Sequence, residues 1–332
     1  TYAGWLGREA SARHGDTGSG VRKRQAGSRP SIMLTTPESL EAMLVSVNLD
    51  AAHMFGDLRA VVVDEVHAFA GDDRGWHLLA VLDRLSAIAG RPLQRIGLSA
   101  TVGNPNALLA WLQGRTRSNQ RSVITALSSD AVEPVLALDF VGSVRNAAKV
   151  VNGIHQGEKR LVFADSRRTV EALALELREL GTDTYVSHSS LSVDERRRAE
   201  AAFAEARDCV IVSTSTLELG IDVGDLDRVI QLGAPNTVAS VLQRLGRTGR
   251  RAESTRNLTF LATDDAELLR AAGLLLLMEE GFVEPVVPPP HPRHIAAQQF
   301  LALALQEGQF GTATWREWWG NLTVMDDGPE IL

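Results

Sequence analysis

The chain is poor in the residues that build disulfide-bonded, zinc-binding or membrane-spanning proteins. It has 332 residues but one cysteine, so an internal disulfide and a cysteine-based zinc cluster are both excluded. Its longest apolar run, residues 271–278, is far shorter than the roughly 20 residues that cross a bilayer. With 44% hydrophobic and 23% charged residues, the composition predicts an ordinary globular chain in a reducing cytoplasm, with Cys209 as a small core residue.

Lysine is also scarce, with 3 lysines beside 31 arginines, a bias that phosphate binding or a GC-rich genome would produce. The net charge of −7 does not exclude a nucleic-acid partner, because whole-chain charge governs solubility rather than a local groove. Basic clusters at 22–24, 167–168, 196–198 and 247–251 are candidate phosphate contacts, although such clusters are often solvated helix faces.

Two arginines lie three residues apart in the glycine-containing stretch 243–250, Gln-Arg-Leu-Gly-Arg-Thr-Gly-Arg. The planar, permanently charged guanidinium groups of Arg247 and Arg250 match phosphate oxygens and suit the charge that develops on a transferring γ-phosphate. Taken alone, the stretch has a solvated basic loop as its alternative interpretation.

A second pattern is the run of β-branched residues at 61–63, followed by Asp64, Glu65 and His67. It predicts a buried parallel strand whose carboxyl edge presents two carboxylates, where open α/β sheets place ligands. Asp64 would hold a hydrated Mg²⁺, Glu65 would orient or deprotonate water, and His67 would relay the presence of the γ-phosphate. An Asp-Glu pair in isolation is also typical of a helix N-terminus.

Another apolar strand follows at 96–98 and ends in small hydroxyl residues, Ser99 and Thr101, which we expect to hydrogen-bond near His67. The order of Asp-Glu-Val-His at 64–67, Ser-Ala-Thr at 99–101, 213–222 and 243–250 resembles superfamily 2 DEAD/DEAH-box helicases. The finer patterns are similar to those of Lhr-type (large helicase-related) proteins, and they are found at 13–17, 34–40, 187–192, 291–292 and 297–299.

The resemblance implies two RecA-like lobes that close on ATP. In the first lobe, Ser99 and Thr101 would couple ATP binding to movement. In the second lobe, Gly220, Asp222 and Gln243 would bind the nucleotide, and Arg247 and Arg250 would contact the γ-phosphate. Five residues match family positions that hold a nucleic-acid strand through its phosphates, which would give no base preference. They are Thr36, Ser166, Arg167, Ser189 and Thr214.

One family pattern is missing, the Gly-x-x-x-x-Gly-Lys-Ser/Thr loop that cradles ATP phosphates. The glycine-rich stretch 15–23 lacks the Gly-Lys-Ser/Thr ending and predicts a polar loop. In the family the phosphate loop lies upstream of everything visible here, and residue 1 is Thr. We therefore expect a fragment of a longer protein that hydrolyses ATP poorly by itself.

Strands alternating with helices predict an α/β fold with two tandem parallel-sheet lobes, the first one truncated. The predicted division is 1–125 for the first lobe, 131–283 for the second, 284–293 for a proline-rich linker and 294–332 for the start of a winged-helix domain. Trp315, Trp318 and Trp319 in the last segment would stack on bases or pack in a core. The second lobe is expected to open with a strand at 160–164. It is also expected to contain a helix at 193–206, a strand at 209–213 and a helix at 238–245.

Family likeness further implies ATP-dependent movement, 3′ to 5′ on single-stranded DNA, with unwinding of duplex DNA or RNA:DNA hybrids in DNA repair. ATP and Mg²⁺ are the implied cofactors, and a cytoplasmic, nucleoid-associated location in a bacterium or archaeon is implied as well. Two alternatives stay open from the sequence. One is a non-hydrolysing nucleic-acid-binding module, and the other is an RNA helicase of DEAD-box or Ski2 type.

Overall fold

The computed structural model describes residues 2–15, 17–18, 20–21, 29–114, 120–125, 133–188, 205–215, 226–249, 251, 254–290, 292–326 and 328. The chain forms two compact units. The first comprises Thr1–Ser99, Asn104–Ile124 and Val286–Leu332, and the second comprises Ala100–Gly103 and Thr125–Pro285. No helix among the described residues is long and apolar enough to cross a membrane.

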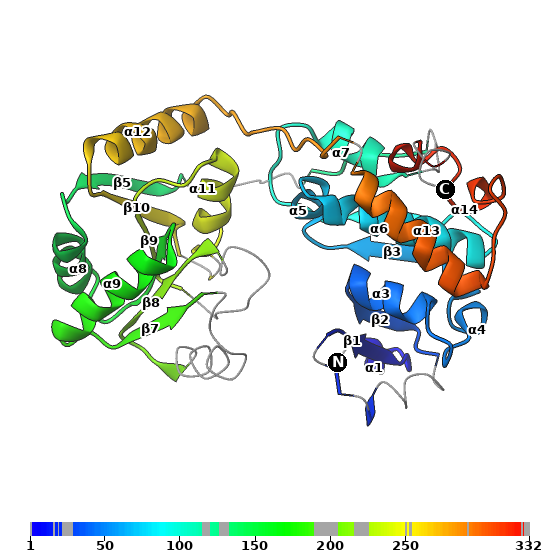
Figure 1. The fold of residues 1–332 in the computed structure, drawn as a ribbon. Coiled ribbons are helices and arrows are strands. Elements are labelled where there is room, and N and C mark those ends of the chain that lie inside the picture. The colour runs from blue at the N-terminus through cyan, green and yellow to red at the C-terminus, as the bar shows by residue number, and fades with distance from the viewer. Residues whose placement is uncertain are drawn as a thin grey trace. The chain divides into compact units, whose positions relative to one another are not determined.

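The second unit is built on a six-stranded, wholly parallel sheet with the order β5-β10-β9-β6-β8-β7. The strands are β5 (Val135–Phe140), β6 (Lys159–Ala164), β7 (Thr184–Ser187), β8 (Cys209–Ser213), β9 (Arg228–Leu232) and β10 (Asn257–Ala262). Figure 1 shows helices on both faces of this sheet. They are α8 (Val144–Gly153), α9 (Arg167–Glu179), α11 (Val238–Leu245) and α12 (Asp265–Glu279).

Alternating side chains of the central strands supply both cores of the second unit. Leu161 and Phe163 of β6 face the core that α11 and α12 cover, whereas Val162 and Ala164 face the core that α8 and α9 cover. Cys209 is fully buried in the first of these cores, as predicted, and burial raises the pKa of its thiol to about 11. This three-layer arrangement explains why central strands contain continuous apolar runs, such as residues 161–164 of β6 and 209–212 of β8.

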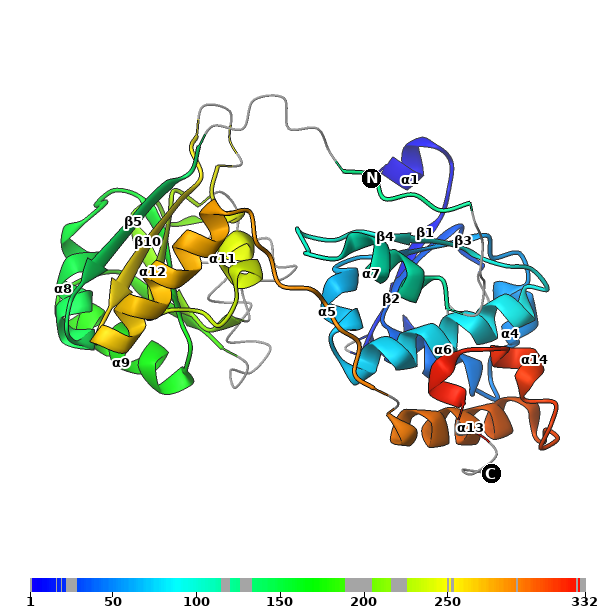
Figure 2. The ribbon, with the colours of Figure 1, turned by 90° about the horizontal axis from the view of Figure 1, so that it is seen from above.

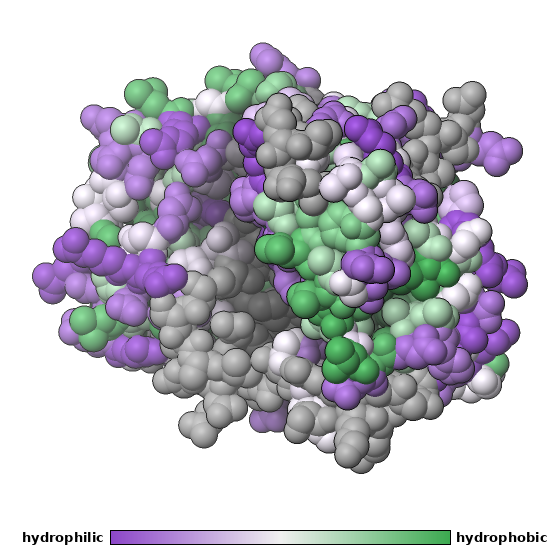
Figure 3. Space-filling view, turned by 45° about the vertical axis from the view of Figure 1, so that its right-hand side comes forward, coloured by the Kyte–Doolittle hydropathy of each residue, from purple (hydrophilic) through white to green (hydrophobic). Residues whose placement is uncertain are grey.

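The first unit has two separate two-stranded parallel sheets, β1-β2 and β3-β4. Their strands are β1 (Ala10–Arg13), β2 (Ile32–Thr35), β3 (Ala60–Val63) and β4 (Gln94–Gly97). The parallel pairing of β3 agrees with the sequence, but the prediction that this strand is buried is wrong, because Val62 is 59% exposed. Among the described residues β3 pairs with β4 alone. Hydrophobic residues also gather on the face of the molecule drawn in Figure 3.

The buried centre of the first unit is instead a helix, α6 (Asp73–Ile88), in which residues 78–82 are at most 4% exposed. Around it pack α3 (Pro37–Leu44), α4 (Ala51–Phe55), α5 (Val66–Ala70), α13 (Arg293–Glu307) and α14 (Arg316–Trp319). Figures 1 and 2 both show α13 alongside α6. The segment after residue 286 therefore packs within the first unit although it follows the second in sequence.

A buried polar cluster fastens α13 to α3 and α6. The Glu41 carboxylate accepts hydrogen bonds from Arg84 and Gln299 and lies 2.7 Å from His77 Nε2. Arg84, which is fully buried, also donates to Gln306 Oε1 from Nη2 at 2.6 Å. Burial alone would raise the pKa of Glu41, but the His77 hydrogen bond and the Arg84 charge lower it to about 2.

The three tryptophans near the carboxyl end do not behave alike. Trp315 and Trp319 are at most 1% exposed, and each makes an edge contact with Phe300 of α13. The Trp319 indole also donates to the Ala80 carbonyl of α6 at 3.1 Å. Core packing is thus correct for these two and base stacking is wrong for them, while Trp318 is only partly buried.

Several element predictions need correction. The second unit opens with β5, not with the strand at 160–164. β5 is a partly exposed edge strand whose apolar run at 135–138 was not recognised as a strand. Five further elements were not predicted from the sequence, namely β1, α8, α7 (Pro105–Leu112) and the two short helices α4 and α5. The helix predicted at 193–206 lies outside the described residues except for its last two positions.

Candidate functional site

Two acids follow β3, as the sequence predicts. Asp64 is exposed, and its Oδ1 accepts the Glu65 backbone N–H at 3.0 Å. Glu65 adopts a left-handed backbone conformation with φ of 49° and starts helix α5. A non-glycine residue in this region costs on the order of 1–3 kcal/mol, and such strain is concentrated at functional sites. The turn therefore places two adjacent carboxylates directly after the strand end.

His67 is held against the end of β4. Its Nδ1 lies 3.1 Å from Ser99 Oγ and 3.6 Å from a carboxylate oxygen of Glu65. The Val66 N–H donates to the Leu98 carbonyl at 2.9 Å, which continues the pairing of the two strands into this region. Burial lowers the pKa of His67, against the opposing effect of the Glu65 and Asp64 charges. The expected contact between Ser99 and His67 is present, whereas Thr101 is exposed.

The arginine turn begins where α11 ends. Arg247 is 9% exposed, and the Thr248 hydroxyl behind it donates to the Leu245 carbonyl and accepts the Asn257 N–H at 2.9 Å. Gly249 has φ of 70°, and a Cβ there would lie 2.8 Å from the Arg256 nitrogen. Both facts require glycine. The turn is thus fixed to the start of β10, with Gln243 partly buried on the last turn of the helix. Arg250 lies outside the described residues.

Sequence reasoning did not assign Arg244, which lies beside Gln243. It is 4% exposed, donates to Gln231 Oε1 of β9 and covers the Phe163 ring at 4.9 Å. Its Nη1 is also 3.8 Å from Asp165, whose carboxyl pKa is raised by burial despite the Arg244 charge. Arg244 thus joins α11 to the carboxyl ends of β6 and β9. A buried position within an arginine-rich stretch leaves no trace in the sequence.

The residues predicted to hold a nucleic-acid strand occupy similar local structures in the two units. Thr36 follows β2 and caps α3 by accepting the Ser39 N–H, and Ser166 follows β6 and caps α9 by accepting the Thr169 N–H at 3.0 Å. Helix N-termini that carry a hydroxyl are suited to phosphate. Arg167 is exposed beside Ser166.

The remaining predicted residues are only partly accounted for. Thr214 follows β8, and its N–H donates to the Ser187 carbonyl at 3.3 Å, so the end of that strand remains paired with β7. Ser189, Gly220 and Asp222 lie outside the described residues.

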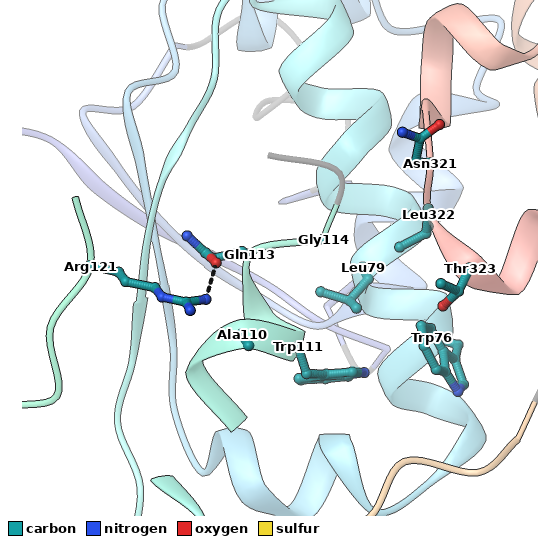
Figure 4. Close-up of a pocket in the computed structure, with 10 residues that line it drawn as sticks. All are labelled: Trp76, Leu79, Ala110, Trp111, Gln113, Gly114, Arg121, Asn321, Leu322 and Thr323. Carbon is teal, nitrogen blue, oxygen red and sulfur yellow. Dashed lines mark hydrogen bonds between the residues drawn. The ribbon is translucent and has the colours of Figure 1, made fainter. Parts of the chain in front are cut away.

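A pocket of the first unit lies elsewhere and involves none of these residues (Figure 4). It is lined by Trp76, Leu79, Ala110, Trp111, Gln113, Gly114, Arg121, Asn321, Leu322 and Thr323. The Arg121 guanidinium, which lies at its edge, donates to Gln113 Oε1 at 2.7 Å. Because its two tryptophan rings meet at 73°, they do not form a parallel sandwich for a flat ligand.

The donor set at the end of β3 suits a metal that is shared with a substrate. In the part of the chain that the structure describes, no three His, Cys, Asp or Glu residues group closely enough to hold a metal. Mg²⁺ is usually bound through one or two carboxylates together with substrate phosphates and water. The exposed Asp64 carboxylate fits that mode of binding.

Two family models match the chain, "DEAD/DEAH box helicase" over residues 3–108 and "Helicase conserved C-terminal domain" over residues 144–252. The first contains the acids after β3, and the second contains the whole arginine stretch at 243–250. The chain belongs to the DEAD/DEAH-box helicases.

Within the family, this helicase chain is similar to Lhr proteins. It is 31% identical over 336 residues to an Lhr helicase of Mycolicibacterium smegmatis and 30% identical over 354 residues to the Lhr helicase/uracil glycosylase of Escherichia coli. Each match covers 89% of this chain and 22% of the relative. The chain therefore spans less than a quarter of the length of these relatives.

The fold agrees with a solved helicase structure. The structure of Mycobacterium smegmatis helicase Lhr bound to ssDNA and AMP-PNP matches with a TM-score of 0.82 and 29% identity. The match covers 98% of this chain and 44% of that one. The two α/β units of the chain thus have the RecA-like helicase fold.

Proposed function

We propose that this chain is the motor region of a longer ATP-dependent helicase that moves 3′ to 5′ on single-stranded DNA. The full protein would unwind duplex DNA or RNA:DNA hybrids and serve DNA repair in the cytoplasm of a bacterium or archaeon, near the nucleoid. The similarity to an Lhr protein whose structure holds ssDNA and AMP-PNP supports DNA as the strand and ATP as the fuel.

The observation that carries the proposal is the cluster at the end of β3. Asp64 and Glu65 are presented together, and His67 in the following helix contacts Ser99 at the end of β4. Asp64 would bind Mg²⁺ on the nucleotide phosphates, and Glu65 would orient the attacking water. His67 and Ser99 would pass the state of the γ-phosphate to the segment that continues through Thr101.

The second unit would contribute the positive charge. Arg247 and Arg250 would stabilise the charge on the transferring phosphoryl group, with Gln243 and the predicted Gly220 and Asp222 beside the nucleotide. Thr36, Ser166, Arg167, Ser189 and Thr214 would grip the strand through its phosphates. Alternating release and binding of the strand by these two sets of residues would move the enzyme stepwise along the strand as ATP is hydrolysed.

The domain assignment belongs to the same proposal. Residues 1–125 would form part of the first RecA-like lobe, 131–283 the second lobe, 284–293 a linker and 294–332 the start of a winged-helix domain. The chain contains no Gly-Lys-Ser/Thr loop, so the phosphate cradle would come from another part of the full protein.

The test uses the full-length protein. ATP hydrolysis would be measured with and without single-stranded DNA, and strand separation would be measured on 3′-tailed DNA and RNA:DNA substrates. Glu65→Gln should lower hydrolysis by roughly 10²–10⁴-fold, the range for loss of a general base. Glu9→Gln removes another exposed carboxylate and leaves the Ile32 N–H bond to the Glu9 backbone carbonyl in place, so it is the matched control and should leave hydrolysis unchanged.

Arg247→Ala should abolish most hydrolysis, by roughly 10³-fold or more, while DNA affinity is retained. Loss of both would instead make the arginine a strand contact. A wild-type protein that binds DNA without DNA-stimulated hydrolysis would overturn the helicase proposal in favour of a binding module. Preferential unwinding of RNA duplexes would instead support the alternative that the protein is an RNA helicase.

A further inference from the structure

The carboxylate of Glu284 accepts hydrogen bonds from the first turn of α11. Its two oxygens take the N–H groups of Val238 at 2.8 Å and Ala239 at 3.1 Å. The Thr237 hydroxyl caps the same helix separately by accepting the Ser240 N–H at 3.1 Å. A carboxylate at a helix N-terminus gains from charge-assisted hydrogen bonds and from the helix dipole. Because the opposite end of α11 leads into the arginine turn, Glu284 holds the helix that positions Gln243 and Arg247.

The main chain of the same residue is attached to a different segment. The Gly103 N–H donates to the Glu284 carbonyl at 3.3 Å, and a Cβ on Gly103 would overlap the carbonyl oxygen of Val283. Position 103 thus requires glycine so that the two backbones can lie this close. Residues 100–103 follow Ser99 directly and pack within the second unit with residues 125–285.

The second-unit segments 100–103 and 125–285 are followed by Asn104 and Val286, which bond to each other within the first unit. The Asn104 side-chain amide donates to the Val286 carbonyl at 2.8 Å and accepts the Val286 N–H at 2.8 Å. Because the Asn104 amide bonds both the N–H and the carbonyl of Val286, the two segments have little freedom to rotate or slide past each other. The stretches of chain that follow Gly103 and Glu284 are therefore fixed in register with each other.

We propose that Glu284 is a positioning residue for ATP hydrolysis. It acts by linking residues 100–103 to helix α11. A displacement of the segment after Ser99 would be passed through the Glu284 backbone and carboxylate to the start of α11. The eight-residue helix would carry it to Arg247 at the other end. The link gives residues 100–103, which follow Ser99, a mechanical route to the arginine turn within the second unit. This inference rests on the proposed function.

The test compares four variants of the full-length protein. Glu284→Gln keeps the size of the side chain but offers one acceptor oxygen for two N–H donors, and Gly103→Ala breaks the backbone end of the link. Thr237→Ala removes the other cap of α11 and leaves the link intact. Glu280→Gln removes a nearby exposed carboxylate at the end of α12.

We expect Glu284→Gln and Gly103→Ala to lower the kcat of DNA-stimulated hydrolysis by roughly tenfold to a hundredfold, the cost of misplacing a reacting group. The KM for ATP and the Kd for single-stranded DNA should change less than threefold. The double variant should be no slower than the slower single variant, because both changes break one link. Thr237→Ala should lower the Tm but not kcat, and Glu280→Gln should change neither.

Two results would overturn the inference. If Thr237→Ala lowers kcat as much as Glu284→Gln, the carboxylate is only a helix cap. If the effects of Glu284→Gln and Gly103→Ala multiply in the double variant, the two residues act independently. Both results are read against a wild-type protein that hydrolyses ATP. A wild type with no DNA-stimulated hydrolysis would be a failure of the proposed function, which is a separate outcome.

Discussion

The two units place their cores in different elements. In the second unit the sheet is the core, because strands β6 and β8 are buried along almost their whole length and helices cover both faces. In the first unit the core is the helix α6, whereas β2, β3 and β4 expose Leu34, Val62 and Leu98 around their ends. A parallel sheet is normally covered on both faces, so the described first-unit strands are poorly supported.

This difference changes what holds each predicted functional segment. The arginine turn of the second unit is supported by a sheet through Arg244, Thr248 and Asn257. The acids of the first unit follow an exposed strand, and the helices behind them are fastened by the Arg84 and Glu41 cluster. Sheet packing thus positions the arginines, and a polar helix cluster stabilises the unit that carries the acids.

The sequence itself supplies a selective reporter for each unit. All six tryptophans, at positions 5, 76, 111, 315, 318 and 319, belong to the first unit, and the single cysteine, Cys209, belongs to the second. Tryptophan fluorescence therefore follows unfolding of the first unit. Reaction of the buried Cys209 thiol with a thiol reagent follows opening of the second unit. The stabilities of the two units can be compared without separating them.

The largest expected effect is that of Arg84→Met in the first unit. The change leaves the buried Glu41 carboxylate without its cationic partner, and breaking a buried ion pair from one side costs about 3–5 kcal/mol. Denaturant unfolding followed by tryptophan fluorescence should show this loss. The reactivity of Cys209 should be unchanged.

The double variant Glu41→Leu/Arg84→Met is the control, because removing both charges avoids an unpaired buried carboxylate. It should recover most of the lost stability. A loss below about 1 kcal/mol in Arg84→Met would mean that the cluster contributes little and that apolar packing of α6 holds the unit.

A matched pair of isoleucines tests the sheets directly. Ile211 of β8 is fully buried, and Ile96 of β4 is 39% exposed. Ile211→Ala should cost about 2–5 kcal/mol and speed up thiol reaction at Cys209. Ile96→Ala should cost about 1 kcal/mol or less in the tryptophan-monitored transition, because less apolar surface is removed from contact. Equal losses would show that the two sheets contribute equally to stability.

The sequence predicted the second unit better than the first for the same reason. Continuous apolar runs such as 209–213 gave the correct bounds of β8, and α11 was predicted at its observed residues. The edge strand β5 was missed although it has an apolar run at 135–138, and the five-residue helix α5 is too short to show helical periodicity. The order of short motifs identified the family where hydrophobic periodicity gave only the fold class.

Long-range polar contacts were beyond sequence reasoning. Glu41 and Gln299 are 258 residues apart, and the Glu284 carboxylate bonds a backbone 46 residues away. Their residue types are ordinary on a helix surface or in a linker, and no local pattern marks them as buried or bonded. The contact between Ser99 and His67 was expected because both residues follow strands that we predicted to belong to one parallel sheet, and the structure pairs these strands, β3 and β4, directly.

The smallest expected effects come from the two hydroxyl caps, Thr36 in the first unit and Ser166 in the second. Alanine at either position should cost about 1 kcal/mol of stability, as for other helix N-caps. If both helix ends grip phosphates, each change should also weaken binding of single-stranded DNA by the full-length protein, by roughly fivefold. Fluorescence anisotropy with labelled oligonucleotides would measure the affinity.

Ser143 provides the control for this comparison, because it caps α8 by accepting the Asn146 N–H at 3.2 Å and has no predicted strand contact. Ser143→Ala should lower stability by a similar amount, about 1 kcal/mol, without changing DNA affinity. Equal losses of affinity in Thr36→Ala and Ser166→Ala would indicate that both units hold the strand through the same local structure. A loss in only one would restrict the grip to that unit, and a loss in Ser143→Ala as well would make all three effects consequences of helix fraying.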